Sequence, residues 1–588
     1  MTFLLGIYRG TWPAHRALRW VLFGAVLATG ALVALGTPNR LHRWAVFLTA
    51  FVLYPGAVGI RQAVAKRWRP LHTALLAGLV CAAFGFCIVT WGNHQYAGPD
   101  HSLMVDVGWR LFRGQIPYRD FICTLPPGFL AGLRYAYQMF GARWDAILYV
   151  DVIFACLTFV WMYKLLSAIL RSRVNAFLAA IAIECAGVLA GSYWWYNNIA
   201  SVTATIFFLS CLLYLRQPES GGAQLSYVAA LAMIGTMKPN TAVPLIFGCV
   251  VLVFIATKAR ARFTALTMAG VACLLGFLML NQFHVLEMIG SYRAAAAARG
   301  ISAFGFMHRT QSEKIRVTIY VGCMLLPGFV LWWKQLRDAI GRRDIRALSV
   351  SALLALAPVV GVYAMFTNGE MKDTDFPLMI CFGAVTLWGR TDQALALPGL
   401  SGTTWKSEAV LRLYASFLVG LAVSDLYLGA SRNRLEFSEG VYFERADAEY
   451  NPGVPYFQHM RASKRMQDVI AQMAQVLRDS GRPVFFGPNL EFGYAAFEID
   501  SPPHLPLWWY AGSSFTAADE PSIAEAFRSS GFPTLVFLRG DPTDTTSAIQ
   551  RMIRESYVED DRWPQLTVYR LRTTAQRAHA GATSVPLR

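Results

Sequence analysis

The chain has 588 residues, of which 55% are hydrophobic and 15% charged, and its mean hydropathy is +0.39. About a quarter of the residues of a soluble globular protein are charged, so this composition excludes that class. Apolar runs of about eighteen or more residues indicate a polytopic α-helical membrane protein. The net charge of +17 does not indicate a nucleic-acid partner, because much of the Lys and Arg falls in short loops between these runs.

We expect about thirteen membrane spans of about twenty residues each. Their approximate ranges are 18–36, 43–61, 72–91, 145–167, 174–192, 198–215, 225–238, 240–257, 263–282, 317–334, 348–366, 375–389 and 409–430. Four strongly basic connections fall on one side of this arrangement, namely 61–70, 170–173, 257–262 and 334–346. Under the positive-inside rule that side is cytoplasmic.

The other loops then face outward, and they hold the clustered carboxylates and the aromatic-rich turns. They are 92–144, 191–198, 237–240, 283–316, 367–377 and the residues after about 431. Within the first of them, residues 101–114 predict a short amphipathic helix along the membrane surface that ends at Gly114. Residues 125–141 predict a second such helix with prolines at its start.

The composition changes after residue 431, where helical and strand-like segments alternate. This order predicts a small α/β domain over 431–575, of the usual domain size of about 150 residues. Its first strand lacks the G-x-G-x-x-G pattern, so we expect no dinucleotide. We expect the tail 576–588 to be disordered.

Asp100 follows the third span and stands just before the predicted helix 101–114. One interpretation is an N-cap, because Asp is strongly favoured at that position. The other is a proton acceptor at the mouth of the membrane, where partial desolvation raises the pKa of a carboxyl group.

The surrounding pattern is an apolar span, a short loop with Asp100, a helix ending in "LFRGQIPYRDF", then "PPG" and a second amphipathic segment. It resembles the first extracytoplasmic loop of GT-C fold glycosyltransferases. It looks in particular like the bacterial relatives of protein O-mannosyltransferases and aminoarabinose transferases. The resemblance covers roughly residues 70 to 380 and implies a GT-C-like transmembrane domain over 1–430.

The resemblance implies an enzyme that transfers a sugar from a polyprenyl-phosphate donor to a hydroxyl of a glycan, lipid or protein. It implies that Asp100 is the catalytic base, with Asp106 as the alternative. Tyr118 and Asp120 match a recurrent turn of the family, with a structural role or an acceptor contact. It also implies a bacterial inner-membrane location, with the active site and the C-terminal domain on the periplasmic face.

Lys238, in "TMKPN", is a second match, because the superfamily has a similar turn with a lysine. A lysine at the outer membrane edge is a point cation where the phosphate of a lipid donor would lie. The alternative is a lysine that only extends from the end of a span into water. Its outward placement, against the positive-inside trend, favours the functional interpretation.

The loop 283–316 holds Arg293, His308 and Arg309, and guanidinium groups suit bidentate phosphate contacts. An ordinary solvated loop helix is the alternative for most of these residues. We expect His308 or Arg309 to lie near the donor phosphate.

Two further outer turns have two interpretations each. Glu370 and Asp373 belong to a dense charged turn that is either solvated or binds acceptor hydroxyls or a divalent cation. Such a cation is the one cofactor we consider, and we expect no zinc, because the His and Cys spacing is wrong for it. Trp194 and Trp195 belong either to an interfacial aromatic belt or to a platform on which a sugar stacks.

Two other functions compete with sugar transfer. Asp151 and Glu184 lie within predicted spans, and intramembrane carboxylates would suit a transporter or flippase for a lipid-linked substrate. The absence of an inverted repeat of helices with paired breaks weakens that interpretation. A non-catalytic membrane scaffold or sensor is the third hypothesis.

Overall fold

The computed structural model describes residues 70–93, 99–189, 194–299, 325, 328–329, 331–333, 335–367, 376–389, 451–480, 483–509, 514–540 and 545–572. The expected spans 18–36, 43–61 and 409–430, most of 317–334 and the tail 576–588 lie outside these residues. Contacts divide the chain into two compact units. We call them the helical unit (Met1–Trp91, Asp151–Phe277 and Ser302–Arg434) and the mixed unit (Gly92–Val150, Leu278–Ile301 and Leu435–Arg588).

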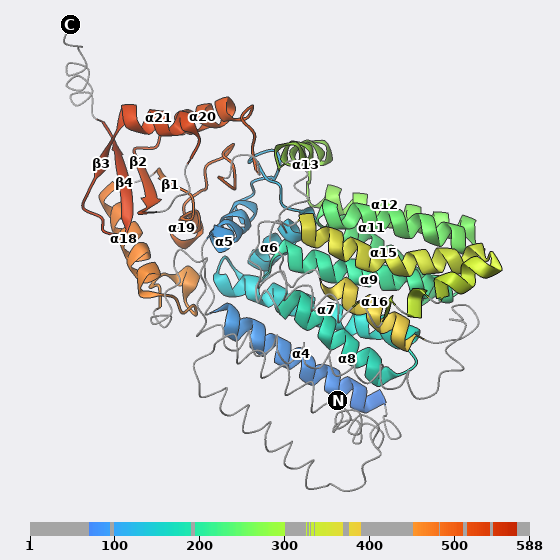
Figure 1. Cartoon of the computed structure of the whole chain (residues 1–588). Helices are drawn as coiled ribbons and strands as arrows, with labels where there is room; N and C mark the ends of the chain where they lie inside the picture. The colour runs from blue at the N-terminus through green and yellow to red at the C-terminus, as the bar shows by residue number, and fades with distance from the viewer. Residues whose placement is uncertain are drawn as a thin grey trace, which may run out of the picture. The chain divides into compact units, whose positions relative to one another are not determined.

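Apolar helices account for most of the described chain up to residue 389 (Figure 1). They are α4 (Pro70–Gly92), α7 (Trp144–Ile169), α8 (Arg173–Glu184), α9 (Tyr196–Arg216), α10 (Gly221–Gly235), α11 (Pro239–Ala256), α12 (Arg260–Leu280), α15 (Ile345–Thr367) and α16 (Phe376–Trp388). Helix α8 continues as a π-helical turn over Cys185–Leu189.

Six of these helices are long and apolar enough to cross a membrane: α4, α7, α9, α11, α12 and α15. Their presence confirms the expectation of a multi-pass α-helical membrane protein. The expected number of thirteen is not confirmed, because α10 and α16 are shorter and several expected spans lie outside the described residues.

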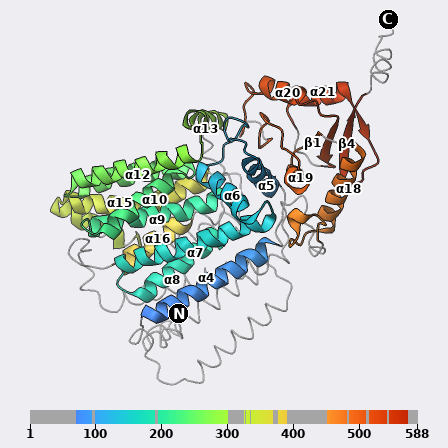
Figure 2. The ribbon, with the colours of Figure 1, turned by 180° about the vertical axis from the view of Figure 1, so that it is seen from behind.

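Helix α9 is the centre of the helical unit. It is buried from Asn198 to Leu215 and packs against α10, α11 and α16 (Figures 1 and 2). Helices α4 and α12 instead leave large apolar side chains exposed, such as Leu79, Phe86 and Met268. Exposing such apolar surfaces to water is unfavourable, whereas lipid tails are as apolar as these side chains. The exposure pattern therefore fits a bilayer as the surrounding solvent.

The mixed unit contains α5 (Pro99–Phe112), α6 (Pro127–Phe140), α13 (Val285–Arg299) and the described residues from 451 onward. The latter form η6 (Pro455–Phe457), α18 (Lys464–Ser480), β1 (Val484–Phe486), α19 (Phe492–Ala496), α20 (Glu520–Ser529), β2 (Thr534–Leu538), α21 (Ser547–Ser556), β3 (Tyr557–Asp560) and β4 (Leu566–Leu571). Helices and strands are thus both present in this part of the chain, as its composition predicts, but α20 directly follows α19 and β4 directly follows β3.

The four strands form one mixed sheet in the order β1-β2-β4-β3. Strands β1 and β2 are parallel, with Val484 opposite Thr534, and the other two pairings are antiparallel. Helices α20 and α21 lie on one side of the sheet and α18 on the other (Figures 1 and 2). Because successive strand residues point to opposite faces, Phe485 packs with the α20 and α21 side chains Phe527 and Ile549.

Helix α5 is not the surface helix that its amphipathic pattern predicts. It is buried from His101 to Leu111, because α6 and α19 both pack against it. Residues far along the chain thus cover a helix that the local sequence alone places at a membrane surface.

Candidate active site

Asp100 is the second residue of α5, which begins at Pro99. It therefore lies inside the first helical turn rather than at the preceding cap position. A carboxylate in the first turn is favoured by the partial positive charge of the helix N-terminus. Its side chain is half-buried, so the group is only partly screened from water.

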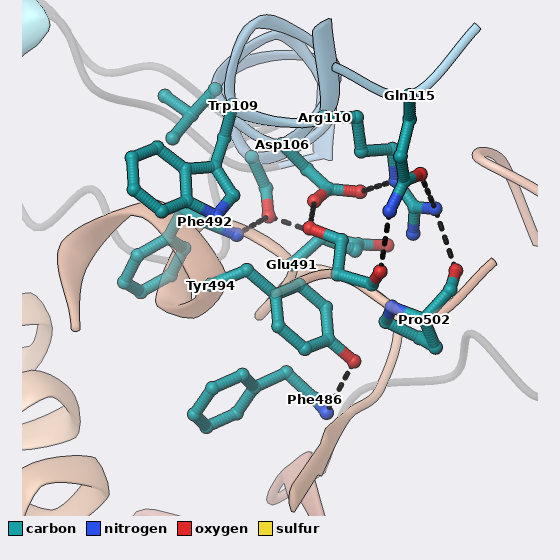
Figure 3. Close-up of polar contacts among 12 residues, drawn as sticks. Asp106, Trp109, Arg110, Gln115, Phe486, Glu491, Phe492, Tyr494 and Pro502 are labelled. Carbon is teal, nitrogen blue, oxygen red and sulfur yellow. Dashed lines mark hydrogen bonds and ion pairs between the residues drawn. The ribbon is translucent and has the colours of Figure 1, made fainter. Parts of the chain in front are cut away.

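Asp106, the alternative base, is fully buried one turn and a half further along the same helix. Its Oδ2 accepts a hydrogen bond from Arg110 Nε at 2.7 Å, and its Oδ1 accepts one from the Ser501 hydroxyl at 2.5 Å (Figure 3). Burial raises the pKa of the Asp106 carboxyl, and the Arg110 charge and the Ser501 hydroxyl oppose that rise. Both oxygens are occupied and water is excluded, so Asp106 in this structure holds segments together and does not face a substrate.

The Arg110 guanidinium is almost as deeply buried as its partner carboxylate. Its Nη1 donates to the Pro502 carbonyl at 2.7 Å and to Gln115 Oε1 at 3.2 Å. The Gln115 amide in turn donates to the Ser501 carbonyl at 2.7 Å (Figure 3). Each buried charge is therefore compensated by an ion-pair partner and by further hydrogen bonds, as burial requires.

The turn "PYRD" is structural in this conformation. Tyr118 is buried with φ 68°, a left-handed conformation that is uncommon for a tyrosine, and its hydroxyl donates to the Leu125 carbonyl at 2.5 Å. Burial raises the pKa of this hydroxyl well above its ordinary value. Asp120 Oδ2 accepts the Ile116 N–H at 2.7 Å, which closes the turn. The hydrogen bond from Arg119 is the main reason that the pKa of the Asp120 carboxyl is lowered.

Lys238 lies in the helical unit as the N-cap residue of α11. Its Nζ donates to Asn197 Oδ1 at 2.8 Å and lies 5.3 Å from the centre of the Tyr196 ring. The lysine borders a small hollow, which in this conformation has room for about one water molecule. The residues that line this hollow are Asn197, Ser201, Lys238, Thr241, Gly361, Ala364 and Leu378.

The sequence reasoning missed the polar residues around this lysine. Asn197 and Ser201 are four residues apart on α9 and so share one helical face, and Thr241 belongs to the first turn of α11. That spacing indicates a polar face on α9. The functional hypothesis considered only the four aromatic residues before Asn197. Together with Lys238, these side chains make a hollow with one cation and several hydrogen-bonding groups.

Trp194 and Trp195, for which the sequence leaves an aromatic belt and a sugar platform as alternatives, are buried in this structure. The Trp194 ring packs edge-on against Phe154 at 5.2 Å, and Trp195 packs against Tyr196 at 4.7 Å. Neither indole presents a free face, so both behave here as packing residues of the helical unit. Tyr196 is the partly exposed aromatic residue beside the cation.

Arg293 is exposed on α13 of the mixed unit. The other predicted donor residues His308 and Arg309, and the predicted acidic residues Glu370 and Asp373, lie outside the described residues. Across the ranges that the structure describes, no three His, Cys, Asp or Glu side chains lie close enough together to hold a metal ion.

No protein-family model and no curated protein matches the chain in sequence. Among solved structures, it is similar to ArnT from Cupriavidus metallidurans, at a TM-score of 0.47 and 13% identity over 85% of this chain and 98% of that one. ArnT bound to undecaprenyl phosphate matches at a TM-score of 0.44 and 12% identity, over 86% and 99%. An oligosaccharyltransferase from Archaeoglobus fulgidus matches at 0.41 and 11%, over 79% and 68%.

A mycobacterial arabinofuranosyltransferase, AftD, matches at a TM-score of 0.43 and 13% identity. The match covers 84% of this chain but only 40% of that larger protein. All four likenesses are at low identity, between 11% and 13%. With TM-scores below 0.5 they carry nothing about the substrates or the mechanism of this chain.

Replacing Asp106 by Ala should lower the free energy of unfolding of the mixed unit by about 3–5 kcal/mol, because the Arg110 charge would stay buried without its partner. The double change Asp106→Leu with Arg110→Met should lower it by less, since no buried charge remains. Pulse proteolysis in urea would measure both. A single variant as stable as the wild type, or a double variant less stable than the single one, would contradict the assignment of a buried ion pair.

The turn at Asp120 should make the stability of the folded protein depend on pH in the acid range. Because the folded-state pKa of Asp120 is lowered, its contribution is present above the unfolded pKa of about 3.9 and is lost as the pH falls through the folded value. Asp120→Asn should reduce the free energy of unfolding at pH 6. It should also make the decrease of that free energy between pH 4 and 3 smaller than in the wild type. Melting curves across this range would measure it, with Asp561→Asn at an exposed position as the control; identical acid slopes in all three proteins would refute it.

Proposed function

We propose that the chain is a GT-C type membrane glycosyltransferase that moves one sugar from a polyprenyl-phosphate donor to a hydroxyl of a glycan, lipid or protein. The observation that carries the proposal is Lys238, a lysine held by Asn197 and Tyr196 at a polar hollow where an apolar helix begins. A lipid-linked phosphate needs this combination, because its tail requires an apolar surface and its charge requires a cation. The GT-C resemblance of the loop around Asp100 supplies the reaction class.

The N-terminus of α11 adds to the attraction for an anion. Lys238 is the N-cap residue of this helix, and its ammonium group, which has no acceptor for the helix N–H groups, donates to Asn197 instead. Helix N-termini carry a partial positive charge and favour phosphate groups. The hydroxyls of Ser201 and Thr241, which line the hollow, can donate to phosphate oxygens.

In the proposed reaction, the Asp100 carboxylate accepts the proton of the acceptor hydroxyl. The hydroxyl oxygen forms a bond to the anomeric carbon as the bond from that carbon to the phosphate oxygen breaks, so the configuration is inverted. The polyprenyl phosphate leaves with the electron pair of the broken bond, and Lys238 stabilises the negative charge that develops on it. No nucleotide is needed, because the activated bond is already in the lipid.

The remaining residues that the sequence singled out take secondary places in this proposal. Arg293, His308 and Arg309 are further candidates for the donor phosphate, and Glu370 and Asp373 for the acceptor or a divalent cation. The distribution of basic loops supports the periplasmic face of a bacterial inner membrane as the side of the reaction, with the domain over 431–575 on that side.

A transporter remains the second candidate, and one observation favours it. Asp151 and Glu184 are buried in the helical unit, and Asp151 Oδ2 and both Glu184 carboxylate oxygens have no hydrogen-bond partner within the described part of the chain. Buried carboxylates within membrane helices suit proton-coupled transport. A transporter would depend on these two residues, whereas the proposed transferase depends on Asp100 and Lys238.

Release of polyprenyl phosphate from a panel of polyprenyl-phosphate pentoses and hexoses tests the proposal, with membranes of the producing cells as the acceptor source. Asp100→Asn should lower kcat by about 10²–10⁴-fold through loss of the base. Lys238→Met should lower it by about 10²–10³-fold through loss of charge stabilisation. Glu184→Gln is the matched control and should keep wild-type transfer. Undiminished release by Asp100→Asn, or loss of release only in Glu184→Gln, would refute the proposal.

A further inference from the structure

One face of α5 contacts residues near the C-terminal end of the chain. Ser102, Asp106, Trp109 and Arg110 follow one another at helical spacing and so share that face. All four bond to residues between 491 and 502. Figure 3 shows Asp106 and Arg110 within this cluster. Helix α5 and residues 491–502 both belong to the mixed unit.

The first anchor is the buried Asp106–Arg110 ion pair with Ser501. A shift of α5 would move Asp106 and Arg110 together, but it would leave these two buried charges without the Ser501 hydroxyl and the Pro502 carbonyl that help to compensate them. The Trp109 indole N–H extends this anchor by donating to the Ile499 carbonyl at 2.7 Å. The hydrogen bonds to Ile499, Ser501 and Pro502 therefore specify the register of α5 against residues 499–502.

The second anchor lies only two residues from Asp100. The Ser102 hydroxyl donates to Glu491 Oε2 at 2.6 Å and accepts the Phe492 N–H at 3.1 Å. Ser102 is fully buried and Glu491 nearly so, so water does not compete for these bonds. Two residues of a helix span about 3 Å along its axis, so this anchor acts on the same helical turn that carries Asp100.

An exposed contact on the same interface offers a contrast. Arg113 Nε lies 2.7 Å from Asp500 Oδ1, but both side chains are largely exposed. Exposed ion pairs contribute little, because water and salt screen them. This pair provides a matched control for the two buried anchors.

We propose that Ser102 and Asp106 are positioning residues, through which the C-terminal part of the chain sets the orientation of Asp100. The inference rests on the proposed role of Asp100 as the base. Two buried anchors on one rigid helix leave its first turn a single orientation. The C-terminal domain thereby affects the reaction by orienting Asp100 rather than by contacting the substrate. Glu491 and Ser501 are the two residues through which it holds α5.

The test compares Glu491→Ala, Glu491→Gln, Asp106→Asn and Arg113→Ala in the full-length protein in nanodiscs. Hydrogen exchange over residues 100–112 reports the anchoring, and kcat and KM for polyprenyl-phosphate sugar, per folded molecule, report the chemistry. Glu491→Ala and Asp106→Asn should speed exchange in α5 by about 10-fold, since each loses a buried hydrogen bond. They should lower kcat by about 10²-fold with KM little changed, as misplacement of a catalytic group does.

Glu491→Gln keeps an oxygen that accepts from Ser102, so it should restore both values, and Arg113→Ala should resemble the wild type. Faster exchange with wild-type kcat would overturn the proposal, because the anchors would then be merely structural. Wild-type exchange in Asp106→Asn and Glu491→Ala would overturn it as well. Failure of the proposed function is distinct, since it appears as full activity of Asp100→Asn whatever the exchange rates are.

Discussion

The buried ion pair between Asp106 and Arg110 is the interaction on which the mixed unit depends. Removing two charges from water costs several kcal/mol per ion, and the structure offsets this with the Ser501 hydroxyl and the Pro502 carbonyl. Those groups come from a segment almost 400 residues further along the chain. The loop after α4 and the C-terminal α/β part therefore have to fold as one body.

The two units supply different parts of the proposed active site. The helical unit supplies an apolar body and a polar hollow at Lys238, which suit the tail and the charge of a lipid phosphate. The mixed unit supplies Asp100 on a helix that is anchored from the C-terminal side. In this account, the C-terminal domain is part of the catalytic apparatus rather than an appended module.

The sequence predicted the class of protein, the helices around Asp100 and the presence of both helices and strands after residue 451, because hydrophobic periodicity records which face of each element is buried. It did not predict that α5 is covered, because the covering residues Glu491 and Ser501 lie far away in the chain. It also missed Asn197 and Ser201, because single polar residues on a buried helix have no pattern of their own. Lys238 was singled out from the sequence, because a charge at the end of an apolar span departs from the trend around it.

The most direct test of the central claim is a cryo-EM structure of the full-length protein with undecaprenyl phosphate. The account predicts phosphate density in the hollow lined by Asn197, Ser201, Lys238 and Thr241, with the Lys238 ammonium turned from Asn197 to a phosphate oxygen. Phosphate bound elsewhere, with Lys238 still donating to Asn197, would contradict it.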